Sequence, residues 1–86
     1  MLYFSSRKFD RQFSKFSEKI KNQCIDRIEI FVKNPYDEIL NNHNLGGAYT
    51  GCRSINMTGD IRIIYEITED NMAHFLKIGT HSELYK

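Results

Sequence analysis

Apolar residues in the first third of the chain recur at the spacing of an α-helix. Phe9, Phe13 and Phe16 stand at positions i, i+4 and i+7, which places them on one helical face. Helical spacing continues through residues 20–32 and stops at Asn34-Pro35, because the residue before a proline is disfavoured in the helical conformation. No glycine or proline separates the two stretches, so the pattern predicts either two helices or one bent helix.

The residues that flank these helices predict a strand before them and a loop after them. Residues 2–5 are aromatic and polar and indicate a short strand, and Ser5 or Ser6 can cap the helix that follows. Residues 35–51 hold the chain's only proline and three of its five glycines. This composition predicts a loop, with one helical turn at residues 37–40.

The last third of the chain changes to the period of two that is typical of strands. Apolar and polar residues alternate in three stretches, which are separated by turn-forming residues at 58–59 and 69–71. Short turns join antiparallel strands, so these stretches predict a three-stranded meander. The predicted strands span residues 52–57, 61–67 and 72–78.

Together these elements predict an α+β fold. A small antiparallel β-sheet, made of the N-terminal strand and the C-terminal three-stranded meander, would pack against the two N-terminal helices. A chain of 86 residues corresponds to one domain, residues 1–86.

Composition narrows the class of protein only a little. The net charge is +1, but residues 1–33 carry eight Lys or Arg and four Asp or Glu, which indicates a basic face or simply a solvated helix surface. No apolar run approaches the roughly 18 residues of a membrane helix. The N-terminus also lacks the pattern of a signal peptide. We therefore expect a cytoplasmic protein with no membrane partner, in which Cys24 and Cys52 stay reduced.

Few chemical motifs stand out. The three histidines lack the spacing of a metal site, and neither a phosphate-binding loop nor a nucleophile motif is present, so we expect no metal and no cofactor. A polar set around the predicted meander suits RNA cleavage by the ribose 2′-OH, which needs only proton transfer and stabilisation of charge. A solvated surface with a few salt bridges is the alternative. The set comprises His43, Arg53, Asn56, Asp60, Arg62, Lys77, His81 and Tyr85.

Three stretches of the second half resemble a known family. The first is His43-Asn44-Leu45-Gly46-Gly47 followed by Gly51-Cys52-Arg53, the second is Gly59-Asp60-Ile61-Arg62-Ile63-Ile64-Tyr65-Glu66-Ile67, and the third is Gly79-Thr80-His81-Ser82-Glu83-Leu84-Tyr85. In this order and spacing they resemble the YafQ branch of the RelE/ParE toxin superfamily. The N-terminal half is similar in layout only. The resemblance implies a RelE-like fold.

The resemblance also implies an activity and partners. Such proteins are toxins of type II toxin–antitoxin systems and act as messenger RNA interferases. They are ribosome-dependent, metal-independent endoribonucleases that cut messenger RNA in the ribosomal A site. A cognate antitoxin is implied, together with a toxin–antitoxin complex that binds operator DNA through the antitoxin.

Residue roles follow position by position from the resemblance. His43, Asp60 and His81 fall on catalytic positions, and His81 is expected to be the general acid. Lys77 falls where the family has an arginine that contacts the scissile phosphate, and Tyr85 falls on a terminal aromatic suited to stack on a base. The polar set adds further candidates for substrate binding, namely Arg53, Asn56 and Arg62.

The chain departs from the family pattern at three positions. Asn56 stands where the branch has another histidine, and Ile61 replaces a tryptophan. Lys77 keeps a positive charge without the bidentate fork of an arginine. Two other functions therefore stay open. One is a ParE-like inhibitor of DNA gyrase, although the ParE branch lacks the terminal Gly-Thr-His that this chain has. The other is a catalytically weakened relative that only binds the antitoxin.

Overall fold

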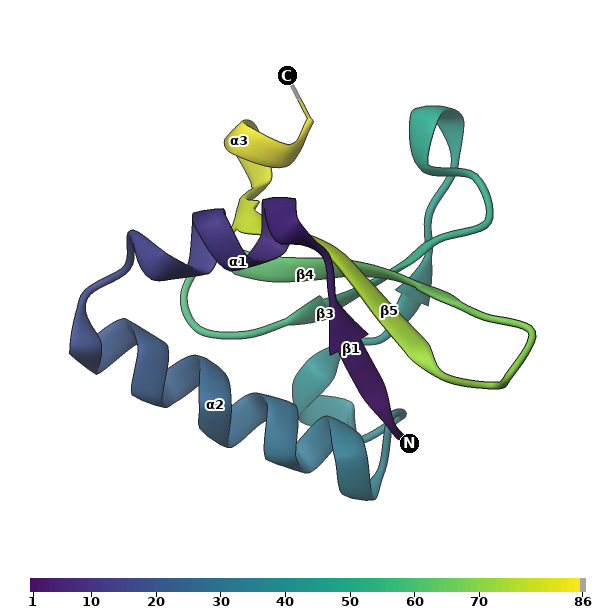
Figure 1. Cartoon of the computed structure of the whole chain (residues 1–86), viewed down its shortest axis with the longest axis horizontal. Coiled ribbons are helices and arrows are strands. Elements are labelled where there is room, and N and C mark those ends of the chain that lie inside the picture. The colour runs from purple at the N-terminus through teal and green to yellow at the C-terminus, as the bar shows by residue number, and fades with distance from the viewer. Residues whose placement is uncertain (86) are drawn as a thin grey trace.

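The fold combines helices with a five-stranded sheet, as described by a computed structural model of residues 1–85 (Figure 1). Along these residues, no helix has both the length and the apolar character needed to cross a membrane. In chain order the elements are β1 (Tyr3–Ser5), α1 (Arg7–Ser14), α2 (Glu18–Lys33), the 3-10 turn η1 (Glu38–Leu40), β2 (His43–Asn44), the 3-10 turn η2 (Gly47–Tyr49), β3 (Arg53–Asn56), β4 (Ile61–Ile67), β5 (Ala73–Thr80) and α3 (His81–Leu84).

Serine caps divide the N-terminal half into two helices rather than one bent helix. The Ser6 hydroxyl accepts a hydrogen bond from a backbone N–H in the first turn of α1, and Ser17 does the same for α2. α2 ends before the extended residue Asn34, which precedes Pro35. η1 confirms the helical turn predicted at residues 37–40.

The strand order of the sheet is β1-β5-β4-β3-β2. β3, β4 and β5 form the predicted antiparallel meander. The prediction of an antiparallel sheet is wrong for β1, which runs parallel to β5. Short turns fix direction only between consecutive strands, and β1 is separated from β5 by all the other strands and both long helices. The two-residue β2, which pairs antiparallel with β3, was not predicted, because it is too short to show a period.

α1 and α2 pack against one face of the sheet and bury the core there. Ile55 and Ile63 face each other across β3 and β4 and are fully buried in this core. Residues that alternate with them therefore point to the opposite side of the sheet, which we call the distal face. The core comprises Phe9, Cys24, Ile28, Phe31, Leu40, Ile55, Met57, Ile63, Tyr65, Ala73, Phe75 and Ile78.

The short helix α3 was also not predicted, and it lies on the distal face (Figure 1). It packs closely on Gly79, where a Cβ atom would lie 3.2 Å from Glu83 Oε1 and 3.6 Å from Leu84 Cδ2. A reciprocal capping box holds its start: Thr80 Oγ1 accepts from the Glu83 N–H, and the Glu83 carboxylate accepts from the Thr80 N–H. The C-terminal residues thereby fold back over the sheet instead of continuing β5.

Candidate active site

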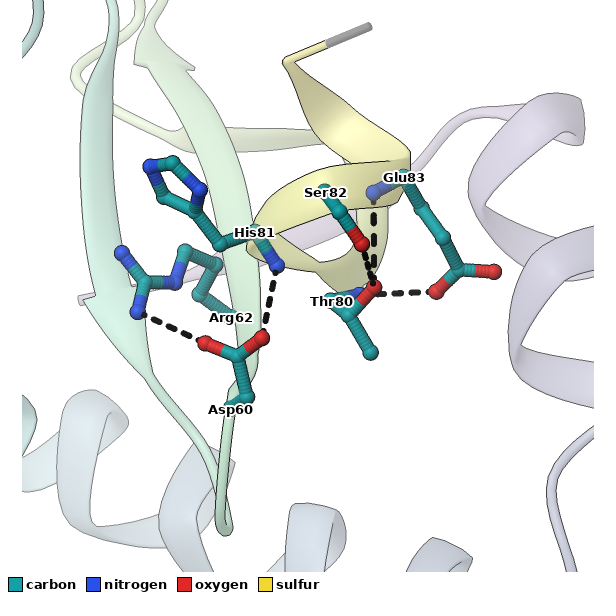
Figure 2. Close-up of polar contacts among 6 residues, drawn as sticks. All are labelled: Asp60, Arg62, Thr80, His81, Ser82 and Glu83. Atoms are coloured by element: carbon teal, nitrogen blue, oxygen red, sulfur yellow. Dashed lines mark hydrogen bonds and ion pairs between the residues drawn. The ribbon is translucent and has the colours of Figure 1, made fainter.

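The turn before β4 and the first residue of α3 meet at the Asp60 carboxylate (Figure 2). Asp60 Oδ1 accepts a hydrogen bond from Arg62 Nη2 over 3.3 Å, and Asp60 Oδ2 accepts one from the His81 backbone N–H over 3.3 Å. Figure 2 shows the His81 imidazole and the Arg62 guanidinium on the same side of this carboxylate. The Asp60 carboxylate therefore ties the permanent cation of Arg62 to the backbone of His81, a residue that can transfer a proton.

Buried polar atoms without a hydrogen-bond partner gather on strands β3 and β4. Within residues 1–85, the side-chain atoms of this kind are Ser54 Oγ, Asn56 Oδ1 and Arg62 Nε. All three residues point to the distal face, and Asn56 lies directly across from Arg62 in the β3–β4 pairing. Because buried polar groups are normally hydrogen-bonded, this cluster is a local exception of the kind found at binding sites and buried waters. The three atoms are inaccessible to solvent, so they mark a gap in the hydrogen bonding of the distal face rather than groups open to a ligand.

Tyr85 borders the His81 side chain. The two ring centroids lie 4.6 Å apart and the ring planes are tilted by 34°. Tyr85 is 38% exposed to solvent, so part of its surface is accessible to a planar ligand. The sequence-predicted residues Asp60, Arg62, His81 and Tyr85 thus share one end of the distal face, with Asn56 beside them.

Lys77 lies on the distal face, but its ammonium group is already engaged. Lys77 Nζ donates a hydrogen bond to the Tyr49 hydroxyl over 2.9 Å and lies 4.9 Å from the Tyr49 ring centroid. The same hydroxyl donates to the Leu84 carbonyl over 2.6 Å. Tyr49 is a residue that the sequence did not single out, because nothing in a glycine-rich loop indicates which side chain folds onto the sheet.

His43 shares the distal face but stands apart from this group. It pairs with Ser54 from β2, the edge strand, and its Nδ1 atom lies 2.7 Å from the Asn41 carbonyl oxygen. Strands are spaced about 4.8 Å apart, so β2 lies roughly 14 Å from β5, the strand that leads into His81. His43 therefore stands on the edge strand, three strands away from the one that leads into His81.

Arg53 points to the other side of the sheet. It lies opposite the core residue Tyr65, and its guanidinium donates to the side-chain oxygens of Asn42 and Asn44. The guanidinium carbon is also 5.4 Å from the Tyr36 ring centroid. Asn42 in turn donates to the Tyr65 hydroxyl over 2.7 Å. The structure thus separates Arg53 from the other candidates and joins it to the core.

The cysteines do not contribute a nucleophile to this arrangement. Both are free thiols, and burial raises the pKa of the Cys24 thiol. Burial, assisted by the negative charge of Glu66, also raises the pKa of the Cys52 thiol. A raised pKa keeps the thiol protonated and unreactive. In the described part of the chain, no three metal-ligating side chains of His, Cys, Asp or Glu gather into a group that could hold a metal ion.

Comparison with known families assigns the chain to a class of proteins. The sequence profile of the YafQ toxins, described as bacterial toxins of type II toxin–antitoxin systems, matches residues 3–86. The chain belongs to the YafQ toxin family. The matched residues include the N-terminal half, which resembled the family only in the order of its predicted elements. None of the curated protein sequences matches the chain.

Solved structures of toxins have the same fold as this YafQ-family chain. YafQ from Escherichia coli has a TM-score of 0.80 at 20% identity, with 98% of this chain and 97% of that chain covered. The Escherichia coli DinJ–YafQ toxin–antitoxin complex gives 0.74 at 19% identity, with 98% and 96% covered. The RelBE2 toxin–antitoxin complex from Mycobacterium tuberculosis gives 0.75 at 15% identity, with 93% and 96% covered. The RelE-like fold predicted from the sequence is confirmed.

Proposed function

We propose that this YafQ-family toxin, acting as one domain over residues 1–86, is a messenger RNA interferase. It is an endoribonuclease that cuts messenger RNA in the ribosomal A site, in the cytoplasm. The observation that supports this proposal most is the Asp60 carboxylate, which holds the Arg62 guanidinium and the start of α3 with His81 together. Transfer of a phosphoryl group from one ribose oxygen to another needs a proton donor and a nearby cation.

The reaction we propose uses the substrate's own 2′-OH as nucleophile. The 2′-oxygen forms a bond to the phosphorus while the bond to the 5′-oxygen breaks, and the products are a 2′,3′-cyclic phosphate and a free 5′-OH. The His81 imidazolium donates a proton to the leaving 5′-oxygen, and the Asp60 carboxylate, which accepts from the His81 backbone N–H, takes up the proton of the 2′-OH. Arg62 stabilises the negative charge that accumulates on the phosphorus oxygens.

Substrate binding is assigned to the rest of the distal face. Tyr85 stacks on a base next to the cleaved bond, since its ring is partly exposed beside His81. Asn56 and Lys77 bind the sugar or phosphate groups that lie over β3 and β5. His43 contacts nucleotides of the RNA that lie farther from the cleaved bond, which fits its position on the edge strand β2.

An antitoxin is the second partner that we propose. The related Escherichia coli YafQ forms a complex with DinJ, and the Mycobacterium tuberculosis RelBE2 structure is also a toxin–antitoxin complex. By analogy, a small cognate antitoxin binds this chain and silences it, and the complex binds operator DNA through the antitoxin.

The proposed activity is tested by inducing the protein in cells and mapping the 5′ ends of cellular RNA. New ends inside translated regions are expected for the wild type and are expected to disappear with His81→Ala. His74→Ala is the matched control, because His74 pairs with Glu66 and stacks on Phe4, away from the site. Growth arrest without new RNA ends, accompanied by loss of gyrase activity, would instead favour the ParE-like alternative.

A further inference from the structure

Tyr49 connects three parts of the distal face through one side chain. Its hydroxyl accepts a hydrogen bond from Lys77 Nζ on β5 and donates one to the Leu84 carbonyl at the end of α3. Its ring packs edge to face with Tyr85, with 5.4 Å between centroids and 87° between planes. Tyr85 in turn contacts the His81 ring. A loop residue that lies 32 positions before His81 is thus linked to it through one intervening ring.

α3 depends on such contacts because it is very short. It contains four residues, whereas isolated helices shorter than about 12–15 residues are marginal in water. Its first turn is held by Asp60 and by the Thr80–Glu83 capping box. At its other end, the Leu84 carbonyl is one of the groups that a helix leaves without an internal partner, and the Tyr49 hydroxyl supplies that partner.

The conformation of the loop before β3 places the Tyr49 hydroxyl on the distal face. Tyr49 ends the 3-10 turn η2, whose first residue, Gly47, has a φ of 60°, and Gly51 follows with a φ of 90°. Both values lie in the left-handed region, which glycine adopts without steric cost. The Cys52 backbone N–H then donates to the Tyr49 carbonyl over 2.9 Å, which closes the loop. The ring is therefore held over Lys77 by an ordered turn.

We infer that Tyr49 is a positioning residue for the catalytic end of this toxin. By holding the last turn of α3 it fixes where His81 and Tyr85 point, and it does so without touching the reacting atoms. This inference rests on the proposed ribonuclease function and adds to it a residue outside the expected catalytic set. It also explains why the Lys77 ammonium is engaged on the protein, since the same hydrogen-bond chain runs from Lys77 through Tyr49 to α3.

The first test removes only the hydroxyl, with Tyr49→Phe. We expect kcat for a ribosome-bound message to fall about 10- to 100-fold, because small misplacements of catalytic groups cost factors of this size. KM and the melting temperature should change little, since the ring and its packing remain. Tyr36→Phe is the matched control, because that hydroxyl belongs to a 65% exposed side chain on the opposite side of the sheet. An unchanged kcat for Tyr49→Phe overturns the inference.

A double-mutant cycle with His81→Ala separates positioning from a general structural effect. If Tyr49 acts through His81, then Tyr49→Phe should change the residual rate of the His81→Ala protein less than about threefold, since residues that act as a unit are not additive. If the rate losses of the two single variants multiply in the double variant, the inference is contradicted.

Hydrogen exchange of backbone amides gives a readout that does not need activity. Tyr49→Phe should speed exchange at residues 84 and 85 while leaving β4 and β5 protected. Unchanged exchange at these amides contradicts the proposed clamp. An inactive wild-type protein counts against the ribonuclease function itself, whereas an active wild type with an unaffected Tyr49→Phe variant counts against this inference alone.

Discussion

The Asp60 carboxylate accepts a hydrogen bond from the His81 backbone N–H, although the two residues are 21 positions apart in the chain. The bond ties the turn between β3 and β4 to the first residue of α3. Because Asp60 also accepts from Arg62, a change at this carboxylate is expected to displace the start of α3 and the Arg62 guanidinium together. These side-chain contacts of Asp60 are thus to other residues of the proposed site, Arg62 and His81, rather than to the core.

Replacing Asp60 by asparagine separates the charge of this residue from its shape. The amide oxygen can still accept one hydrogen bond, but it can neither take up a proton nor attract Arg62. We expect cleavage to fall about 100-fold or more, in the range typical for loss of a proton-transfer group, with an unchanged melting temperature. A single-turnover cleavage assay measures the rate, and activity within a few-fold of wild type would exclude Asp60 from proton transfer.

Arg62 should matter more for the rate than Lys77. The Arg62 guanidinium is held at the Asp60 carboxylate, to which the His81 backbone N–H also donates, whereas the Lys77 ammonium is bound to Tyr49. We expect Arg62→Gln to lower kcat about 100-fold, which is typical for loss of one stabilising donor, and Lys77→Gln to lower it by roughly tenfold or less. The reverse order of the two variants would show that Lys77 is the cation that contacts the scissile phosphate.

Arg53 is expected to stabilise the fold rather than to bind RNA. Its guanidinium and the Tyr65 hydroxyl share Asn42 at the edge of the core. Arg53→Met should lower the free energy of unfolding by about 1–3 kcal/mol, the usual effect of leaving buried polar groups without partners. Urea unfolding measures this change. A variant that is as stable as wild type but fails to cleave RNA would return Arg53 to the substrate-binding group.

The position of Arg53 illustrates what the sequence could and could not predict. Period-two alternation predicted the meander correctly, and it already places Arg53 on the same side as the core residue Ile55. Naming Arg53 as a candidate for substrate binding relied on residue type and did not use that parity. The parallel direction of β1, the fold of α3 and the position of Tyr49 depend on long-range contacts, which have no period in the sequence.

The candidate site was predictable only in part, for a related reason. Asp60, His81 and Tyr85 were identified because short stretches around them resemble the YafQ branch, and the structure brings these three together with Arg62. The resemblance could not show that His43 stands on a distant edge strand. It also could not show that Tyr49 engages Lys77, since that contact joins a loop to a strand.

Burial of Tyr65 predicts a loss of stability at alkaline pH. Burial raises the pKa of this phenol, and the Asn42 and Arg53 contacts oppose that shift only in part. The stabilisation is fully present below the unfolded pKa of about 10 and is lost as the pH rises through the higher folded pKa. Urea unfolding of the wild type and of Tyr65→Phe between neutral and alkaline pH should show a steeper decline for the wild type. Parallel curves would contradict this assignment.

The central claim, that His81 acts as general acid in a metal-free transfer to the 2′-oxygen, is tested most directly by one measurement. Purified ribosomes carrying a defined message are mixed with wild type or with His81→Ala, and both the cleavage rate and the chemistry of the new ends are determined. We predict a rate lower by about 10²- to 10⁴-fold for His81→Ala, with 2′,3′-cyclic phosphate and 5′-OH ends in the wild-type products. A fully active His81→Ala protein, or products with a 5′-phosphate, would contradict the account.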